Sequence, residues 1–277
     1  MIIGAQKCGT TTLHNVLNSH SDVFFPRYPQ EIHFFDLEDE YAKGLPFYRE
    51  LFDAHDGQAI VAQTSPLYMY LAEVPERIGA AIEHCKFIVI LRDPVQRAYS
   101  HYWHEVRWGF EPLEIEEALA QEAARIRVGD YERRNFSYVD RGRYAAQIER
   151  FRKRFGADNL LVVFQDQLRK NPEALRRQCA EFLKIDPAGF ADLDAGAKVL
   201  NPAMLPRSRR LQLLRPRLAD RSRQLASALD RLNLKSGQYP PMTEATRQTL
   251  TGLFEGEAEK LKAVVADTQP DLTIPWA

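Results

Sequence analysis

The feature that most constrains the fold is an alternation between short apolar runs and longer segments with helical periodicity. Each apolar run is short enough to be a buried strand, and the intervening segments have apolar residues at helical spacing. Strands and helices that alternate in this way predict an α/β fold, a central parallel sheet flanked by helices. Ligands of such sheets bind outside the carboxyl ends of the strands. The predicted strands are Met1–Ile3, Ala59–Ala62, Lys86–Leu91 and Leu160–Phe164, and the predicted helices are Thr11–Ser19, Val74–Glu83, Pro94–Trp108, Arg143–Phe155 and Pro172–Leu183.

Length and composition narrow the class of protein. The 277 residues are enough for one α/β domain with a large core, and we predict a single domain over residues 1–277. Basic and acidic residues number 37 and 38, so a site for phosphate must be locally basic. No window reaches the roughly 18 apolar residues of a membrane span, and three widely spaced cysteines predict neither a disulfide framework nor a metal site. We expect a cytoplasmic protein or a trimmed catalytic domain.

Three later stretches have weaker patterns. Residues 105–137 are rich in charge and predict a helix followed by a mobile loop. Residues 186–223 predict a basic loop that leads into a helix. Residues 241–265 predict a helix on the outside of the sheet.

The segment from Gly4 to Thr12 follows a predicted strand and opens a helix. Gly4 and Gly9 let the backbone approach a ligand closely, and the N–H groups and dipole of the helix start favour an anion. Lys7 adds a positive charge, and three threonines add hydroxyl donors. A Walker A loop has Lys-Ser/Thr directly after its second glycine, whereas this lysine lies inside the loop. The usual magnesium-binding hydroxyl is therefore absent, which counts against a metal–nucleotide kinase.

Residues 6 to 13, Gln-Lys-Cys-Gly-Thr-Thr-Thr-Leu, resemble the 5′-phosphosulfate loop of the sulfotransferases that use 3′-phosphoadenosine-5′-phosphosulfate (PAPS). The resemblance implies the P-loop-like sulfotransferase fold, with PAPS as cofactor and 3′,5′-ADP as its product. It also implies that the loop lysine contacts the oxygen that bridges phosphate and sulfate. The cofactor-binding residues predicted in this loop are Lys7, Cys8, Gly9, Thr10, Thr11 and Thr12.

A second phosphate site is predicted where an apolar strand ends at Arg92 and a helix begins. Ser100 lies off the apolar stripe of that helix, about 9 Å along its axis from the first turn. A long arginine side chain can bridge much of this distance, although each residue taken alone has an ordinary structural explanation. Residues 92 to 100, Arg-Asp-Pro-x-x-Arg-Ala-Tyr-Ser, resemble the family's 3′-phosphate motif, which implies that Arg92 and Ser100 bind the 3′-phosphate. Arg97 is expected to be a surface or salt-bridging residue.

The segment from Gln30 to Asp36 offers a possible base. If it is extended, Glu31 and His33 point to one face, and a carboxylate there can take a proton from an acceptor hydroxyl. A glutamate and a histidine in a loop are, without other evidence, more often ordinary hydrogen-bonding residues. The segment resembles the Lys-Glu-x-His-Phe-Phe stretch of heparan-type sulfotransferases, with Gln30 in place of the lysine. This resemblance implies that Glu31 is the catalytic base and that His33 either supports it or is itself the base.

Three further segments are assigned by resemblance to the family. Residues 63–68 look like the segment that lines the acceptor cleft, and residues 141–144 look like another family segment, although a plain helix start explains the latter equally well. The family has a late basic loop that covers the cofactor and carries Lys-Gly-Arg, which is absent here. Lys198, or Arg207 with Arg209, could replace it, although a solvated basic face is an equal explanation. The predicted substrate-binding residues are Gln63, Ser65, Tyr68, Arg141 and Tyr144, and the predicted late cofactor-binding residues are Lys198 and Arg207.

These patterns together predict transfer of a sulfuryl group from PAPS to a hydroxyl or amine of a glycan, a lipid-linked molecule or another small molecule. They predict no nucleic-acid partner and no metal. Two other classes stay open, a nucleotide kinase with a variant P-loop and a non-catalytic module that binds a nucleotide or glycan.

Overall fold

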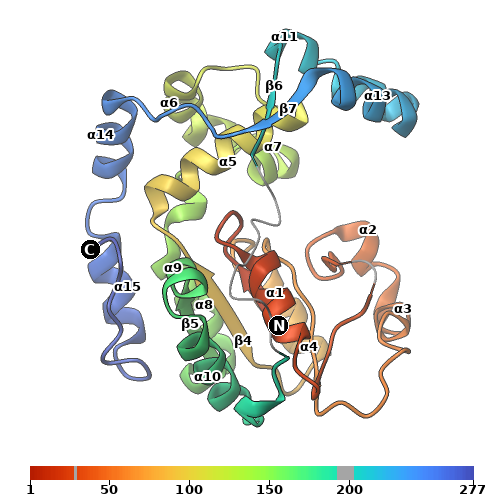
Figure 1. Cartoon of the computed structure of the whole chain (residues 1–277), viewed down its shortest axis with the longest axis vertical. Coiled ribbons are helices and arrows are strands. Elements are labelled where there is room, and N and C mark those ends of the chain that lie inside the picture. Colours follow the sequence, from red (N-terminus) through yellow and green to blue (C-terminus); the bar gives the residue numbers. More distant parts are fainter. Residues whose placement is uncertain (28–29, 192–202) are drawn as a thin grey trace. The chain divides into compact units, whose positions relative to one another are not determined.

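The computed structural model describes residues 1–27, 30–191 and 203–277, and the chain folds into two compact units (Figure 1). The first unit consists of Met1–Arg92, Tyr144–Leu200 and Gly256–Ala277. The second unit consists of Asp93–Arg143 and Asn201–Glu255. Each unit has its own cluster of buried apolar side chains. That residues 1–277 form a single domain stays a prediction.

A parallel sheet forms the centre of the first unit. Strand β4 (Phe87–Leu91) lies between β1 (Ile2–Gly4) and β5 (Leu160–Phe164). A parallel bridge from Ile2 to Thr64 connects β1 to the segment after β3 (Ile60–Val61), and β3 pairs in parallel with β2 (Val23–Phe24). All four predicted strands are present, and the two-residue β2 is an addition that the apolar pattern did not reveal.

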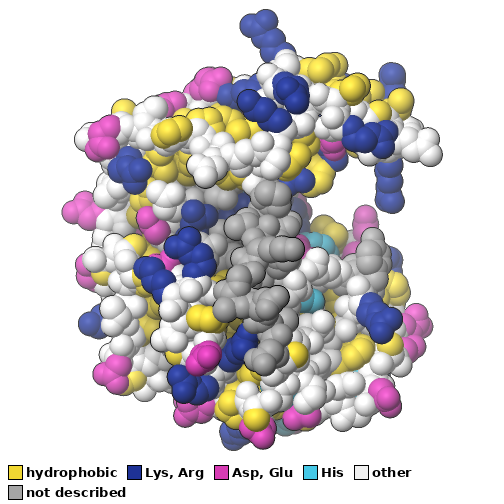
Figure 2. Space-filling view, viewed as in Figure 1, with side chains coloured by type: hydrophobic (Ala, Val, Ile, Leu, Met, Phe, Trp, Pro, Cys, Tyr) yellow, Lys and Arg dark blue, Asp and Glu magenta, His cyan; other side chains and the backbone are white. Residues whose placement is uncertain are grey.

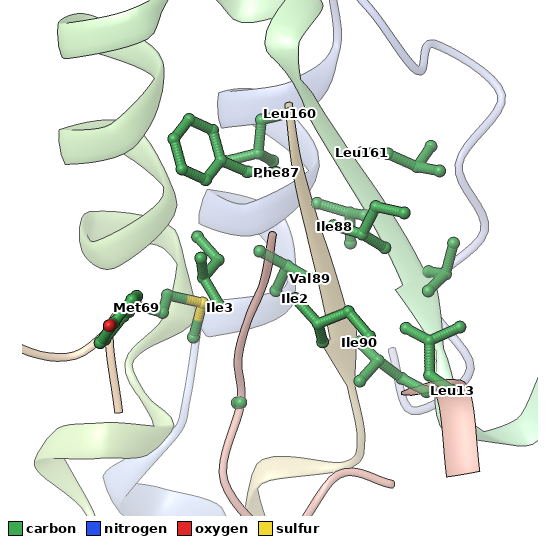
Figure 3. Close-up of a cluster of buried hydrophobic side chains, with 14 of the residues drawn as sticks. Ile2, Ile3, Leu13, Met69, Phe87, Ile88, Val89, Ile90, Leu160 and Leu161 are labelled. Carbon is green, nitrogen blue, oxygen red and sulfur yellow. The ribbon is translucent and has the colours of Figure 1, made fainter. Parts of the chain in front are cut away.

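The central strand β4 is buried on both faces, as its unbroken apolar sequence requires. Figure 3 shows Phe87 and Ile88 on opposite sides of the strand, with Leu13 on the side of Ile88 and Ile90. The Phe87 ring lies 5.1 Å from that of Phe151 in α8, so α8 covers the other face. The helices of this unit are α1 (Thr10–Asn18), α2 (Glu38–Tyr41), α3 (Gly44–Glu50), α4 (Val74–Ala81), α8 (Tyr144–Phe155), α9 (Gln165–Lys170), α10 (Pro172–Leu183) and α15 (Glu257–Val265).

Strand β5 is at the edge of this three-stranded sheet, and the side chain of Gln269 pairs with its middle residue. The Gln269 amide oxygen accepts a hydrogen bond from Val162 N–H at 2.8 Å, and its NH2 group donates to the Val162 carbonyl at 2.9 Å. Nearby, Asp267 forms an ion pair with Arg152 of α8. The C-terminal stretch therefore satisfies backbone groups that an edge strand otherwise presents to solvent or to another chain.

Helix α5 (Pro94–Trp108) has the bounds that its sequence predicts. The Asp93 side chain accepts a hydrogen bond from Val95 N–H at the helix start, and Gly109 ends the helix with φ 75°. Strands β6 and β7 pair in antiparallel orientation. The remaining elements of the second unit are α6 (Ile115–Arg125), α7 (Asp130–Asn135), β6 (Ala203–Pro206), α11 (Arg209–Gln212), α12 (Arg215–Arg221), α13 (Arg223–Asn233), β7 (Leu234–Gly237) and α14 (Glu244–Leu253).

Two expectations about weakly patterned stretches were wrong, and a third, on residues 186–223, falls partly outside the described residues. After α5, residues 105–137 form two further helices instead of a mobile loop, because Ala118, Leu119 and Phe136 pack into the core of the second unit. Residues 241–265 form two helices, because Gly256 has a left-handed conformation between them. The described part of the basic stretch before Arg223 contains β6, α11 and α12. Within the described residues, no helix is long and apolar enough to cross a membrane.

Candidate active site

The phosphate loop, residues 4–12, connects the carboxyl end of β1 to α1. Lys7 and Gly9 have φ values of 70° and 96°, the left-handed backbone that turns successive N–H groups into an anion-binding concavity. Gly9 is the N-cap residue of α1 and has no side chain that could cap the helix, so the N–H groups of the helix start can bind a ligand. A Cβ atom on Gly9 would lie 3.2 Å from Leu168 Cδ1 on a backbone that L residues rarely adopt. The conformation therefore favours glycine there, and the tight contact with Leu168 adds to this preference.

The hydroxyl of Tyr144 lies between the phosphate loop and the end of β4. It donates a hydrogen bond to the backbone carbonyl of Arg92 at 3.0 Å and lies 3.6 Å from Cys8 Sγ. The Cys8 thiol also lies 3.9 Å from the Gln6 carbonyl, to which it can donate. Both Tyr144 and Cys8 are buried. Tyr144 thus connects two predicted phosphate motifs, and its contact with an acceptor stays a prediction.

Glu31, His33 and Asp36 form a charged cluster. His33 Nδ1 lies 3.0 Å from Asp36 Oδ2, and its Nε2 lies 3.7 Å from Glu31 Oε2. Burial alone would lower the pKa of His33, but hydrogen bonds and charge from Asp36 and Glu31 outweigh it and raise the pKa to about 9. The imidazole is therefore protonated at neutral pH. The Asp36 side chain is fully buried whereas that of Glu31 is 43% exposed, so Glu31 is the carboxylate that a substrate can reach.

Backbone hydrogen bonds fix the segment that carries this cluster. Ile32 N–H donates to the Thr64 carbonyl at 3.0 Å, and Phe35 N–H donates to the Tyr68 hydroxyl at 3.1 Å. Ile32 is buried, as are Phe34 and Phe35, while Glu31 and His33 remain together on the other side. This alternation is the one that the sequence predicts for the segment.

Helix α1 contributes a histidine that no sequence pattern singled out. His14 Nδ1 lies 3.0 Å from Thr64 Oγ1, and the His14 ring centroid lies 4.1 Å from that of Phe25. Burial lowers the pKa of His14, and the charge of Glu31 opposes this shift only in part. His14 is therefore neutral at neutral pH. Its hydrogen bond connects the helix of the phosphate loop to the residue that holds Ile32, the neighbour of Glu31.

The side chains predicted to line the acceptor cleft are more deeply buried than expected. Tyr68 is fully buried and its hydroxyl holds the Phe35 N–H, so it supports the Glu31 segment from inside. Gln63 is buried and its amide lies 3.2 Å from Met1 Sδ. The Ser65 hydroxyl is buried and has no hydrogen-bond partner among the described residues. A substrate contact stays a prediction for these positions.

The two residues of the predicted 3′-phosphate pair belong to different units. Arg92 is the last residue of the first unit, and Ser100 is a buried residue in the second turn of α5. Arg97, expected to be a surface or salt-bridging residue, is fully buried, and its Nη2 donates to the Tyr138 carbonyl. The charge of Arg97 also acts on Glu122, which accepts hydrogen bonds from two backbone N–H groups nearby. Arg97 is therefore part of the interior of the second unit, where its Nε and Nη1 have no hydrogen-bond partner among the described residues.

Comparison with known proteins identifies the chain. A model described as the sulfotransferase domain matches residues 1–195. The chain belongs to the sulfotransferase domain family. The predicted resemblance, the predicted fold and the expectation of an enzyme of this class are confirmed at the level of the family.

Relatives in this sulfotransferase family differ in length from the chain. Heparan sulfate glucosamine 3-O-sulfotransferase 5 of Mus musculus is 31% identical over 196 residues, which cover 68% of this chain and 53% of the relative. The mouse bifunctional heparan sulfate N-deacetylase/N-sulfotransferase 4 is 29% identical over 198 residues, 68% of this chain and 22% of the relative. The chain thus spans about half the length, or less, of these curated relatives.

Solved sulfotransferases share the fold. The crystal structure of a sulfotransferase from Alicyclobacillus acidocaldarius has a TM-score of 0.69 and 25% identity, and the match covers 95% of this chain and 94% of that one. A mouse sulfotransferase complexed with PAP has a TM-score of 0.50 and 16% identity, with 98% and 88% covered.

The remaining predicted sites of this sulfotransferase-family chain lie mostly in the second unit. Arg141 is buried, and its Nη2 donates to the Arg134 carbonyl at 2.6 Å, which accounts for it without a substrate. Arg207 is exposed directly after β6. Lys198 lies outside the described residues. Among the residues that are described, no group of three or more acidic, histidine or cysteine side chains could hold a metal ion.

Proposed function

We propose that the chain transfers a sulfuryl group from PAPS to a hydroxyl or amine of an acceptor, with Glu31 as general base. The observation that carries this proposal is the position of Glu31. It is an exposed carboxylate beside a protonated His33, on a segment hydrogen-bonded to Thr64, which in turn is bonded to the helix of the phosphate loop. A base and an anion-binding loop in one rigid part of the first unit are what an in-line group transfer needs.

The residues of the phosphate loop fit the 5′-phosphosulfate end of PAPS. The left-handed backbone at Lys7 and Gly9, the uncapped start of α1 and the lysine side chain together favour a bound anion. Arg92 and Ser100 would hold the 3′-phosphate, as their resemblance to the family motif implies. When bound, PAPS supplies the sulfuryl group and a leaving phosphate oxygen. The mouse relative complexed with PAP is consistent with this choice of cofactor.

The chemical step can be written with the residues of the first unit. The acceptor oxygen or nitrogen forms a bond to sulfur, and Glu31 takes its proton. The bond from sulfur to the bridging oxygen breaks, and its electron pair stays on the phosphate oxygen. Lys7 stabilises the negative charge that grows there, an effect worth about 3–4 kcal/mol for one well-placed donor. His33, protonated between two carboxylates, orients Glu31 rather than acting as the base.

The class of acceptor is inferred from the names of the curated relatives. The names of the curated relatives refer to heparan sulfate, so a glycan is the first class to test, followed by lipid-linked molecules and other small molecules. Two relatives act at an oxygen and a nitrogen by name, and a carboxylate base serves either acceptor equally.

A transfer assay tests the proposal. Isotope-labelled PAPS is incubated with the protein and a panel of glycans, lipids, alcohols and amines, and labelled products are separated and counted. We expect transfer that EDTA leaves unchanged, together with thermal stabilisation by 3′,5′-ADP of about 2.7 kcal/mol at 100 times its dissociation constant. Stabilisation by Mg-ATP without any by 3′,5′-ADP would instead support a kinase. Stabilisation by 3′,5′-ADP with no transfer to any acceptor would support a binding module.

A further inference from the structure

The second unit presents an exposed surface on and beside helices α12 and α13 in which cations and leucines alternate. Figure 2 shows Lys and Arg side chains beside hydrophobic ones in the region where Figure 1 places α11 and α13. Neither the phosphate loop nor the Glu31 cluster includes any of these residues. The α12–α13 face is defined here by the exposed residues Arg217, Arg221, Arg223, Leu225, Arg231, Leu232 and Lys235.

The cations of this face form no ion pairs within the described fold. Residues 215–235 contain six basic and two acidic side chains. One basic residue, Arg215, is paired with Asp230 at 2.9 Å, on the side of α13 that packs toward α11. The five cations of the α12–α13 face have no acidic partner within 4.0 Å in the described part of the chain. Their charge is therefore available to an anionic partner.

The leucines of this face lie on one side of α13. Leu225 and Leu232 are 50% and 77% exposed and seven residues apart, which places them within about 20° of each other around the helix. Ala226 and Leu229 face the interior of the second unit and are buried, so the packing of α13 is complete without the two exposed leucines. Leucines on one stripe with arginines beside them make α13 an amphipathic helix with its apolar edge uncovered.

Three kinds of partner could cover such a face, and charge decides among them. In a symmetric pair of this chain the same patch would meet itself, so five cations would oppose five cations. A soluble polyanion would neutralise the cations but leave both leucines in water. An anionic lipid surface satisfies both features, because leucines enter the interface while arginine and lysine side chains reach the headgroups.

We propose that the α12–α13 face docks on an anionic lipid surface, with Leu225 and Leu232 inserted at the boundary between headgroups and acyl chains. This interaction is independent of the proposed sulfuryl transfer. It would hold the enzyme where lipid-borne acceptors are concentrated.

Vesicle sedimentation tests the proposal. The full chain is mixed with vesicles of phosphatidylcholine, alone or with phosphatidylglycerol, and the bound fraction is measured at low and high salt. We expect binding only to vesicles that contain phosphatidylglycerol. A Leu225→Ser/Leu232→Ser variant, with unchanged charge, should lose about tenfold in partitioning. Arg223→Gln and Arg231→Gln should each cost roughly fivefold at low salt. Leu253→Ser, a change at an exposed leucine of α14, serves as the matched control and should bind like the wild type.

Other outcomes would overturn the proposal. Absence of binding to either vesicle removes it. Vesicle binding that the leucine changes leave intact would show a purely electrostatic surface, as for a soluble polyanion. Sedimentation of a dimer that the leucine changes dissociate, without vesicle binding, would assign the face to a second copy. Because all substituted side chains are exposed, each variant should unfold at the wild-type temperature. A Leu232→Trp variant gives a second measurement, since its emission should shift to the blue on binding.

Discussion

The hydroxyl of Tyr144 donates a hydrogen bond to the carbonyl of Arg92 and lies 3.6 Å from the thiol of Cys8. One buried side chain on α8 thereby fixes the end of β4 relative to the phosphate loop. If the two segments bind the two phosphate ends of one nucleotide, this phenol sets their spacing.

Replacement of Tyr144 by phenylalanine should weaken binding of 3′,5′-ADP more than binding of 5′-AMP. Loss of one hydrogen bond costs about 1 kcal/mol, or about fivefold in affinity, and only the ligand with both phosphates depends on the spacing. Calorimetric titration with both nucleotides measures the ratio. Tyr131→Phe, at an exposed tyrosine, is the control. An equal loss for both ligands would leave Tyr144 as an ordinary core residue.

Replacement of Glu31 by glutamine should lower kcat by about 10²–10⁴ and leave the affinity for 3′,5′-ADP unchanged. The reason is that the amide keeps the shape of the side chain but cannot take a proton. Glu40→Gln, at a surface residue of α2, should have wild-type turnover. A Glu31→Gln enzyme with full turnover would remove this residue as the base.

Activity should fall on the alkaline side with the titration of His33. Its pKa is raised from 6.5 to about 9, so His33 of the folded enzyme is protonated at neutral pH and loses its charge as the pH rises through about 9. The pH dependence of kcat/KM should therefore have an alkaline limb near 9, and His33→Gln should remove that limb. A limb that persists unchanged in the variant would belong to another group.

Replacement of Lys7 by alanine should reduce kcat by about 10²–10³, the cost of one lost donor to a developing oxyanion. Single-turnover rates with saturating PAPS measure this effect apart from binding. Lys153→Ala removes an exposed lysine of α8 and should have no effect. A change confined to KM would mean that Lys7 binds the ground state and the transition state equally.

Replacement of Gln269 by alanine should destabilise the first unit by about 1–3 kcal/mol, because Val162 then loses partners for both its N–H and its carbonyl. Denaturant unfolding measures the loss. Gln248→Ala changes an exposed glutamine of α14 and should be neutral. A neutral result at Gln269 would mean that water replaces its amide at the strand edge.

The sequence was most informative where local chemistry decides the structure. Strand β4 and helix α5 were predicted well because a continuous apolar run and an Asp-Pro helix start are local signals. The charged cluster was predicted only as two residues, Glu31 and His33. Asp36 completes it through a turn whose shape depends on burial of Phe34 and Phe35.

Residues whose roles depend on distant partners could not be assigned from local patterns. His14 was missed because its partner, Thr64, is 50 positions away. Arg97 was predicted to be a surface or salt-bridging residue because the sequence around it does not indicate its hydrogen bond to the carbonyl of Tyr138. The hydrogen bonds that the hydroxyls of Tyr144 and Tyr68 make to the Arg92 carbonyl and the Phe35 N–H were likewise not predicted, and their predicted contact with a substrate stays a prediction.

The pairing of Gln269 with β5 has a consequence for the chain as it is made. Leu261, Val265 and Ile274 belong to the same core as strands β1, β4 and β5, yet they are synthesised about a hundred residues after β5. During synthesis on the ribosome, one edge of the sheet and one face of α8 therefore remain exposed until this stretch has been made. Chaperones that bind exposed strands should therefore bind this nascent chain until α15 has emerged. Termination shortly before residue 256 should yield aggregates rather than a smaller folded enzyme.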